Sequence, residues 1–173
     1  MKKPQASRNP KSQVAAPPPE PLDRIDRKIL NRLQRDAAIP NQDLAEQVGL
    51  SPAPTSRRVR RLKEEGYIAR EVALVDPARV GSTLIAFVSV ELDRQREDVL
   101  RAFERHISTQ PEVQQCYFVT GETEYLLIVL CRDMDHYNDF VRQVLAQEHN
   151  IKRFRSSFNL QRIKFDTGIY LEE

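Results

Sequence analysis

Four arginines lie at positions 57, 58, 60 and 61, in a segment that opens with Ser51-Pro52 and closes at Gly66. Ser favours the helix N-cap, and Pro fits the first helical position because the N–H there has no intrahelical partner. At 100° per residue one face of this helix holds Thr55, Val59 and Leu62. The outer face holds Ala53, Ser56, Arg57, Arg60 and Arg61. Guanidinium groups bind phosphates and guanine edges, so this face predicts nucleic-acid binding.

Two shorter helices are predicted before the arginine-rich one. Residues 22–36 place Leu22, Ile25, Ile29 and Leu33 at helical spacing, with Asp23 at the N-terminus. Asn41 is expected to cap a second helix that ends at Gly49. A helix-turn-helix at about residues 41–60 would place its second helix in a DNA major groove. We expect Ser51, Ser56, Arg57 and Arg60 to face the groove, and Arg61 with the Arg24, Arg27 and Lys28 face to meet phosphates.

The hydrophobic period changes from residue 83 onward. Strands are predicted at 84–92, 113–120, 125–132 and 154–160, with helices at 98–110 and 135–148. The order βαββαβ indicates a ferredoxin-like domain. Short strands are also expected at 71–75 and, as a fifth member of the sheet, at 163–171. The predicted organisation is a flexible Pro-rich tail at 1–21, a DNA-binding domain at 22–83 and a ferredoxin-like domain at 84–173.

The charge is divided between the two halves of the chain. Residues 1–80 carry 16 Lys and Arg against 10 Asp and Glu, whereas residues 81–173 carry 11 against 15. A basic front half suits a phosphate-binding module.

Cys116 and Cys131 are predicted to be buried thiols. The three histidines lack metal-ligand spacing and no catalytic fingerprint occurs, so we expect no enzyme, metal or cofactor. The absence of a long apolar run and of a signal h-region favours the cytoplasm and excludes a membrane.

The run LDRIDRKILNRLQRDAAIPNQDLAEQVGLSPAPTSRRVRRLKEEGYI resembles the N-terminal domain of the Lrp/AsnC (leucine-responsive, feast/famine) family. The agreement continues through ALVDPARVG and CYFVTGETEYLL and covers about residues 22–171. The resemblance implies an α+β protein with an N-terminal winged helix-turn-helix domain and a C-terminal ferredoxin-like βαββαβ domain. It also implies a bacterial, nucleoid-associated transcription regulator that binds double-stranded DNA and assembles from homodimers into a homo-octamer.

The family's effector loop resembles G-D-x-D-Y, and here it reads Gly121-Glu122-Thr123-Glu124-Tyr125. The resemblance implies an effector site at these five residues, with Ala146 and Ser157 contributed by a neighbouring subunit. Carboxylates beside exposed backbone amides suit a free amino acid. Both aspartates are replaced by glutamates, and Gln147–Ile151 replaces a Leu-Pro-Gly-Val-like connection. Two alternatives remain open: the turn is simply polar and solvated, and the protein is a constitutive architectural DNA-binding protein without an effector.

Overall fold

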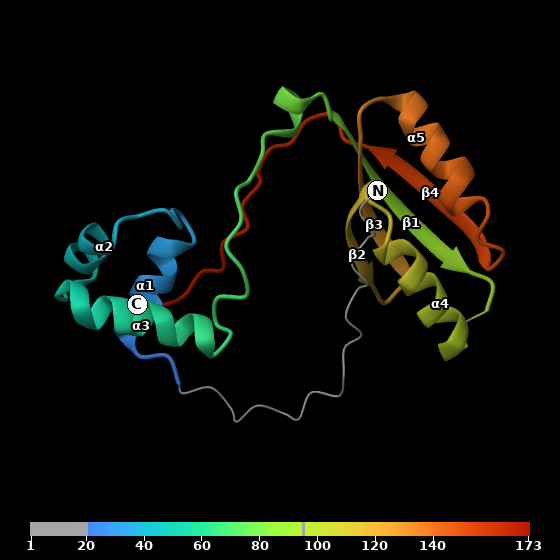
Figure 1. The fold of residues 1–173 in the computed structure, drawn as a ribbon. Helices are drawn as coiled ribbons and strands as arrows, with labels where there is room; N and C mark the ends of the chain where they lie inside the picture. The colour runs from blue at the N-terminus through green and yellow to red at the C-terminus, as the bar shows by residue number, and fades with distance from the viewer. Residues whose placement is uncertain (1–20, 95) are drawn as a thin grey trace, which may run out of the picture. The chain divides into compact units, whose positions relative to one another are not determined.

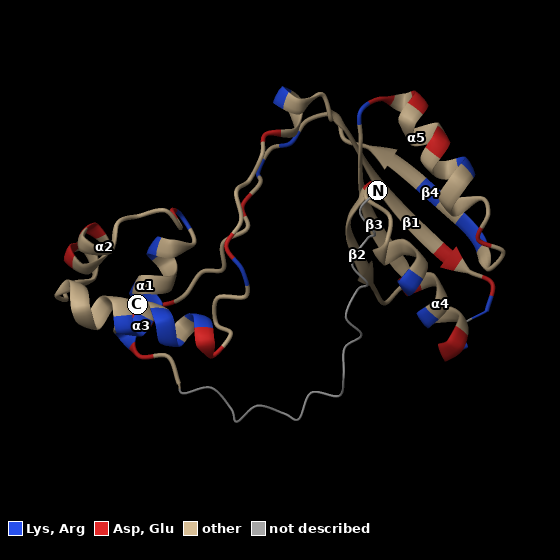
Figure 2. Cartoon of the chain, viewed as in Figure 1, with Lys and Arg blue, Asp and Glu red and all other residues tan. Residues whose placement is uncertain are grey.

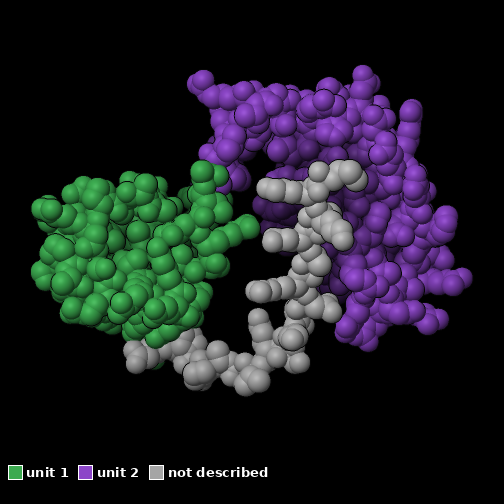
Figure 3. All heavy atoms as spheres, in the orientation of Figure 1, with its two compact units in different colours: residues 1–73, 166–173 green, residues 74–165 purple. Residues whose placement is uncertain are grey.

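The computed structural model describes residues 21–94 and 96–173 of the 173-residue chain. It divides into two compact units, coloured separately in Figure 3. The helical unit comprises residues up to Ala73 together with Asp166–Glu173, and the sheet unit comprises Leu74–Phe165. Apart from Pro21, the tail predicted at 1–21 lies outside the described residues. No helix among the described residues is long and apolar enough to cross a membrane.

The helical unit contains three helices, α1 (Arg24–Leu33), α2 (Asn41–Val48) and α3 (Pro52–Glu64) (Figure 1). Their inward faces form one small core of Ile29, Leu30, Leu44, Val48 and Leu62. Thr55 and Leu62 are fully buried on α3 and Val59 packs against the same core, which confirms the predicted inner face. The connection from α2 to α3 turns at Gly49, whose φ of 77° is the left-handed conformation that glycine adopts without strain.

A buried carboxylate joins α1 to α3. Asp23 caps α1 by accepting the Asp26 N–H at 2.8 Å, and Asp26 accepts the Asp23 N–H in return, which completes a capping box. The Asp26 side chain is 1% exposed and also pairs with Arg58 at 2.8 Å and with Arg61. Arg58 reaches Asp23 as well, at 2.6 Å. Hydrogen bonds to Asp26 and then Asp23 raise the pKa of Arg58, against the opposing effect of burial.

Three local predictions for the helical unit are wrong. Asn41 is the first residue of α2 and not its N-cap, a place that Pro40 takes; the Asn41 side chain instead donates to the Pro52 carbonyl at 2.9 Å. The strand expected at 71–75 has no regular secondary structure, and its apolar side chains, such as Val72 and Leu74, are exposed. The strand expected at 163–171 is also absent, and its end packs against the helical unit, where Leu171 contacts the core.

The sheet unit is an antiparallel four-stranded sheet in the order β2-β3-β1-β4 (Figure 1). Its elements are the short 3₁₀ helix η1 (Pro77–Val80), β1 (Leu84–Leu92), α4 (Glu97–Ser108), β2 (Val113–Phe118), β3 (Tyr125–Cys131), α5 (Met134–Phe140), η2 (Val141–Leu145) and β4 (Ile151–Phe158). The βαββαβ order is confirmed. The second helix differs from the expected 135–148, because α5 passes into a π-helical turn at Val141 and ends at Leu145.

The two faces of the sheet are covered differently. Alternate residues of β1 and β3, from Ala86 to Leu92 and from Tyr125 to Cys131, are buried against α4 and α5. The opposite face carries Phe87, whose neighbours across the strands are Ile128 and Ser157. Phe87 is 39% exposed, and Tyr117 at the β2 edge is 50% exposed. Over the described residues, this second face is therefore partly apolar and partly exposed, and it is called the uncovered sheet face below.

Replacing Asp26 by alanine is expected to destabilise the helical unit by about 1–3 kcal/mol. The change removes a buried acceptor of charged hydrogen bonds, while Arg58 and Arg61 are exposed enough to turn partly toward water. Native-state hydrogen exchange of the α1 and α3 amides measures this loss. Glu46→Ala, on the exposed side of α2, is the matched control. Unchanged α3 protection in Asp26→Ala would show that the ion pairs do not hold α3 to α1.

Candidate nucleic-acid interface and ligand site

The four arginines of α3 divide into two pairs. Arg57 and Arg60 are exposed, and the Arg60 side chain keeps 72% of its surface accessible with only a loose pair to Glu64 at 3.8 Å. Arg58 and Arg61 are 32% and 27% exposed and are held by Asp26. The sequence places Arg61 on the outer face with Arg57 and Arg60, but the structure turns its guanidinium toward α1. Asp26 lies on the inner side of α1, one position after Ile25. Because a buried carboxylate requires a cationic partner, this position is the sequence clue that an arginine of α3 turns inward.

The outer face of α3 is otherwise as the sequence predicts. Ser51, Ala53 and Ser56 are all exposed, along the same side as Arg57 and Arg60. Figure 2 shows the basic residues gathered on the C-terminal part of α3. On α1, Arg24 and Arg27 are also exposed, while Lys28 is half-buried. The face is polar and cationic, on a helix whose other side is fixed in a core, and it is suited to phosphates and base edges.

The turn between β2 and β3 is built by backbone hydrogen bonds and one glutamate. Gly121 has a φ of 134°, a conformation that favours glycine. The Val119 N–H donates to the Glu124 carbonyl at 2.8 Å, and the Glu124 N–H donates to Val90 at 3.1 Å. The Glu124 carboxylate accepts the Leu92 N–H at 2.9 Å, beside the register shift of β1. Glu124 therefore braces the turn against β1.

A hollow of about 330 Å³ opens beside this turn. Its lining residues are Leu100, Phe118, Val119, Thr120, Gly121, Thr123 and Glu124. This is large enough for a small metabolite, and the lining mixes apolar side chains with hydroxyl and carboxylate groups, as ligand sites do. Of these residues, Leu100, Phe118, Val119 and Thr120 are not among the sequence candidates. Leu100 comes from α4, and no local pattern in the sequence links it to the turn.

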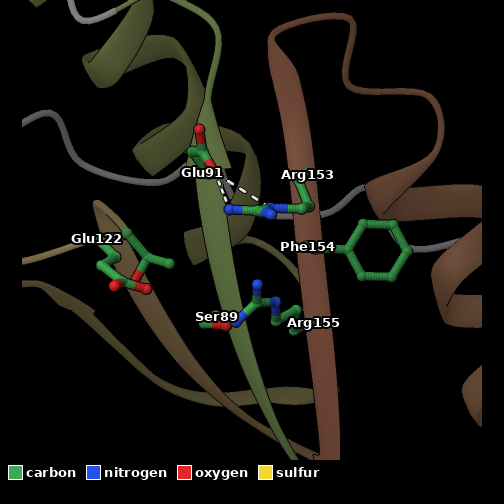
Figure 4. A pocket seen from close by; sticks show the side chains of 7 residues that line it. Ser89, Glu91, Glu122, Arg153, Phe154 and Arg155 are labelled. Atoms are coloured by element: carbon green, nitrogen blue, oxygen red, sulfur yellow. Dashed lines mark hydrogen bonds and ion pairs between the residues drawn. The ribbon is translucent and has the colours of Figure 1, made fainter.

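A second, much smaller pocket lies on the other side of the same turn. Glu122 and Thr123 border it together with Ser89, Glu91, Arg153, Phe154 and Arg155 (Figure 4). Glu91 is paired with Lys152 at 2.6 Å and with Arg153 at 2.8 Å, and these cations lower the pKa of Glu91. Glu122 is exposed at the rim. The two glutamates of the turn thus differ, since Glu124 is engaged with β1 and Glu122 faces solvent.

The remaining ligand-site candidates do not line either pocket. Tyr125 is buried below the turn, where its hydroxyl donates to Glu104 at 2.9 Å and its ring packs on Phe103 and Phe118. Burial and then Glu104 raise the pKa of Tyr125. Ala146 is exposed after η2, and Ser157 is exposed on the uncovered sheet face. Of the seven residues, the single chain brings Gly121, Thr123 and Glu124 together in the hollow and Glu122 beside it.

The two cysteines differ in exposure. Cys131 is buried as expected, and burial raises its pKa to about 11, whereas Cys116 is exposed, contrary to the prediction. Cys116 lies on β2, an edge strand whose residues are largely uncovered. Within residues 21–94 and 96–173 no group of three or more His, Cys, Asp and Glu side chains could hold a metal ion.

Comparisons with known proteins agree with this architecture. Residues 22–69 match the winged helix-turn-helix DNA-binding model, and residues 85–169 match the Lrp/AsnC ligand binding domain. The chain is similar to the Bkd operon transcriptional regulator of Pseudomonas aeruginosa, with 41% identity over 82% of this chain and 93% of the relative. It is also similar to the leucine-responsive regulatory protein of Escherichia coli, with 37% identity over 85% and 90% of the two chains.

A solved structure extends the likeness to three dimensions. The transcriptional regulator of Neisseria meningitidis in complex with L-methionine superposes with a TM-score of 0.83 at 37% identity, covering 87% of this chain and 97% of that one. The two matched models together span the helix-turn-helix and the sheet with its turn. The chain therefore belongs to the Lrp/AsnC family of transcriptional regulators, with a DNA-binding helix-turn-helix and a ligand-binding domain.

Proposed function

We propose that α3 enters the DNA major groove and reads bases through Ser51, Ala53, Ser56, Arg57 and Arg60. The two sides of α3 support this proposal. The inner side is fixed by the core and by Asp26, while Arg57 and Arg60 on the outer side remain exposed. The loose Arg60–Glu64 pair is a surface interaction that DNA phosphates or bases can replace at little cost. Arg61 pairs with Asp26, so we assign it, together with Arg58, to positioning α3 instead of contacting DNA.

Phosphate contacts are proposed for the exposed cations of α1. Arg24 and Arg27 lie in the helix that is locked to α3 by Asp26, so they move with the reading helix as one body. Contacts of this kind orient the protein on the duplex without selecting sequence. They also make affinity depend on salt, because each neutralised phosphate releases a counterion.

The proposed effector is a free amino acid bound in the hollow beside the β2–β3 turn. Its size and mixed lining suit such a molecule, and the similar Neisseria regulator was crystallised with L-methionine. Glu124 is the carboxylate that lines the hollow, and its two oxygens can accept from the ligand's ammonium group in addition to the Leu92 N–H. Hydroxyl groups of Thr120 and Thr123 are placed to bind the ligand's polar atoms. Binding in this turn would regulate DNA affinity through the assembly.

The uncovered sheet face is the proposed dimer interface. Phe87, Ile128 and Tyr117 form a partly exposed apolar strip that a second copy would bury, with two-fold symmetry bringing the same strip from each chain together. Ser157 lies on this face and Ala146 lies after η2, which suits the role that the family resemblance gives them as residues contributed across subunits. Further association of dimers into an octamer is proposed on that resemblance.

Arg57→Ala is expected to weaken binding to a duplex selected by the protein from a random pool by about 1–3 kcal/mol, because a base-edge contact is lost. Binding is measured by fluorescence anisotropy at fixed salt. The matched control is Arg105→Ala, which removes an exposed arginine from α4 in the other unit. Equal affinities of Arg57→Ala and the unaltered protein would contradict the assignment of the outer face.

An amino acid that binds the hollow should raise the melting temperature of the protein by about 5–10 °C at roughly 100-fold excess over its Kd, since ligand binds only the folded state. The screen uses the twenty amino acids, beginning with L-methionine. Glu124→Gln should abolish the shift, whereas Glu122→Gln, outside the hollow, and Asp139→Asn, on the exposed side of α5, should keep it. Absence of any shift across the set would favour the architectural protein without an effector.

Ile128→Arg is expected to halve the smallest assembly seen by light scattering, because a charge in the centre of the apolar strip must be desolvated on pairing. Asn138→Arg places the same charge on the exposed side of α5 and should leave the mass unchanged. If Ile128→Arg retains the mass of the unaltered protein, the sheet face is not the interface.

A further inference from the structure

One face of α1 binds the C-terminal segment of the same chain. Arg27, Asn31 and Gln34 are spaced i, i+4 and i+7, so their side chains lie along one side of the helix. All three donate to backbone carbonyls of this segment: Gln34 to Ile169 at 2.9 Å, Asn31 to Leu171 at 2.8 Å and Arg27 to Glu172 at 3.4 Å. The last two turns of α1 and its C-cap thus hold successive parts of one extended peptide.

Gln34 forms the most specific of these contacts. Its side-chain amide donates to the Ile169 carbonyl and accepts the Ile169 N–H at 2.6 Å, so it pairs with the peptide backbone as a neighbouring strand would. The chain is aligned for this contact by a tight turn in which the Gly168 N–H donates to Asp166 at 2.8 Å. A Cβ on Gly168 would approach Asp166 Oδ1 to 3.1 Å, so the turn leaves little room for a side chain.

Leu171 adds an apolar anchor between these hydrogen bonds. It is half-buried and packs against the core of the helical unit, whereas its neighbours Ile169 and Tyr170 are 72% and 86% exposed. The core that Leu171 joins includes Leu62 of α3, and Val59 of the same helix packs against it. A change in how this segment docks therefore reaches the helix that carries Arg57 and Arg60.

The docked segment is the continuation of β4. The Asn159 N–H donates to the Ile85 carbonyl at 2.9 Å, which anchors the end of β4 to the sheet. Residues 160–165 follow and are exposed. When fully extended, these six residues span at most about 20 Å. Arg153, Phe154 and Arg155 of the same strand border the pocket that contains Glu122.

We propose that Asp166–Glu173 is a strap whose docking on α1 holds the helical unit in the arrangement that binds DNA tightly. The inference rests on the proposed role of α3 in DNA binding. Among the described residues, the strap's hydrogen bonds go to α1 and its C-cap and Leu171 packs on the core, so the strap acts through α1 and the shared core. The segment that docks on α1 is therefore part of the same chain. Its Leu171 side chain packs on the helical core, and the backbone groups of Ile169 pair with the Gln34 side-chain amide.

The test uses full-length protein with Leu171→Ala and, separately, Gln34→Ala. Each variant should increase hydrogen exchange of the α1 amides about tenfold while leaving β1 and β3 unchanged. Each should also weaken binding to the selected duplex by about fivefold or more, at the low end of allosteric coupling. The slope of log K against log salt should stay as in the unaltered protein, because no phosphate contact is removed.

The matched controls are Tyr170→Ala and Arg35→Ala, exposed neighbours of the two altered residues; both should behave as the unaltered protein. Unchanged α1 exchange in Leu171→Ala and Gln34→Ala would overturn the docking of the strap. Increased exchange with unchanged DNA affinity would overturn its role in DNA binding. If the unaltered protein selects no duplex, the proposed DNA-reading role fails, while the exchange data still decide whether the strap is docked.

Discussion

The ion network at Asp26 is the interaction on which the DNA-binding surface depends. The apolar core of the helical unit reaches α3 through Leu62, with Val59 packed against it, so apolar packing fixes only one narrow face of this polar helix. A carboxylate that is 1% exposed and bonded to Arg58, Arg61 and the Asp23 N–H adds directional contacts between α1 and α3. Because a buried carboxylate that loses a partner is costly, these ion pairs also set the rotation of α3.

The same network explains why the four closely spaced arginines of α3 differ in exposure. Arg58 and Arg61 neutralise acidic groups inside the unit, and Arg57 and Arg60 are left for an external anion. The turn at Gly121 shows a parallel division between its two glutamates, since Glu124 supports β1 and Glu122 faces solvent. On α3 neighbouring arginines are about 100° apart around the helix axis, so Arg58 and Arg61 face Asp26 while Arg57 and Arg60 remain exposed.

Local pattern predicted much of the fold. Helical spacing placed Thr55, Val59 and Leu62 in the core, and alternation in LIAFVSVEL placed the β1 strand at its observed bounds. The errors arise where distant contacts decide. The 163–171 stretch has strand-like composition, but Gln34 and Asn31 capture its backbone and Leu171 enters the helical core. Likewise Arg61 has the helical phase of an outer residue, and only the buried position of Asp26 reveals its partner. The hollow includes Leu100 of α4, which no spacing in the sequence relates to the turn.

In the proposed complex, α3 reads DNA with Arg57 and Arg60 while Asp26 holds Arg58 and Arg61 in place. A structure of the protein bound to its selected duplex tests this most directly. We expect α3 to lie in the major groove, with the Arg57 and Arg60 guanidinium groups at base edges and the Asp26 pairs intact. A complex in which Arg58 and Arg61 leave Asp26 for the DNA, or in which α3 lies outside the groove, would contradict it.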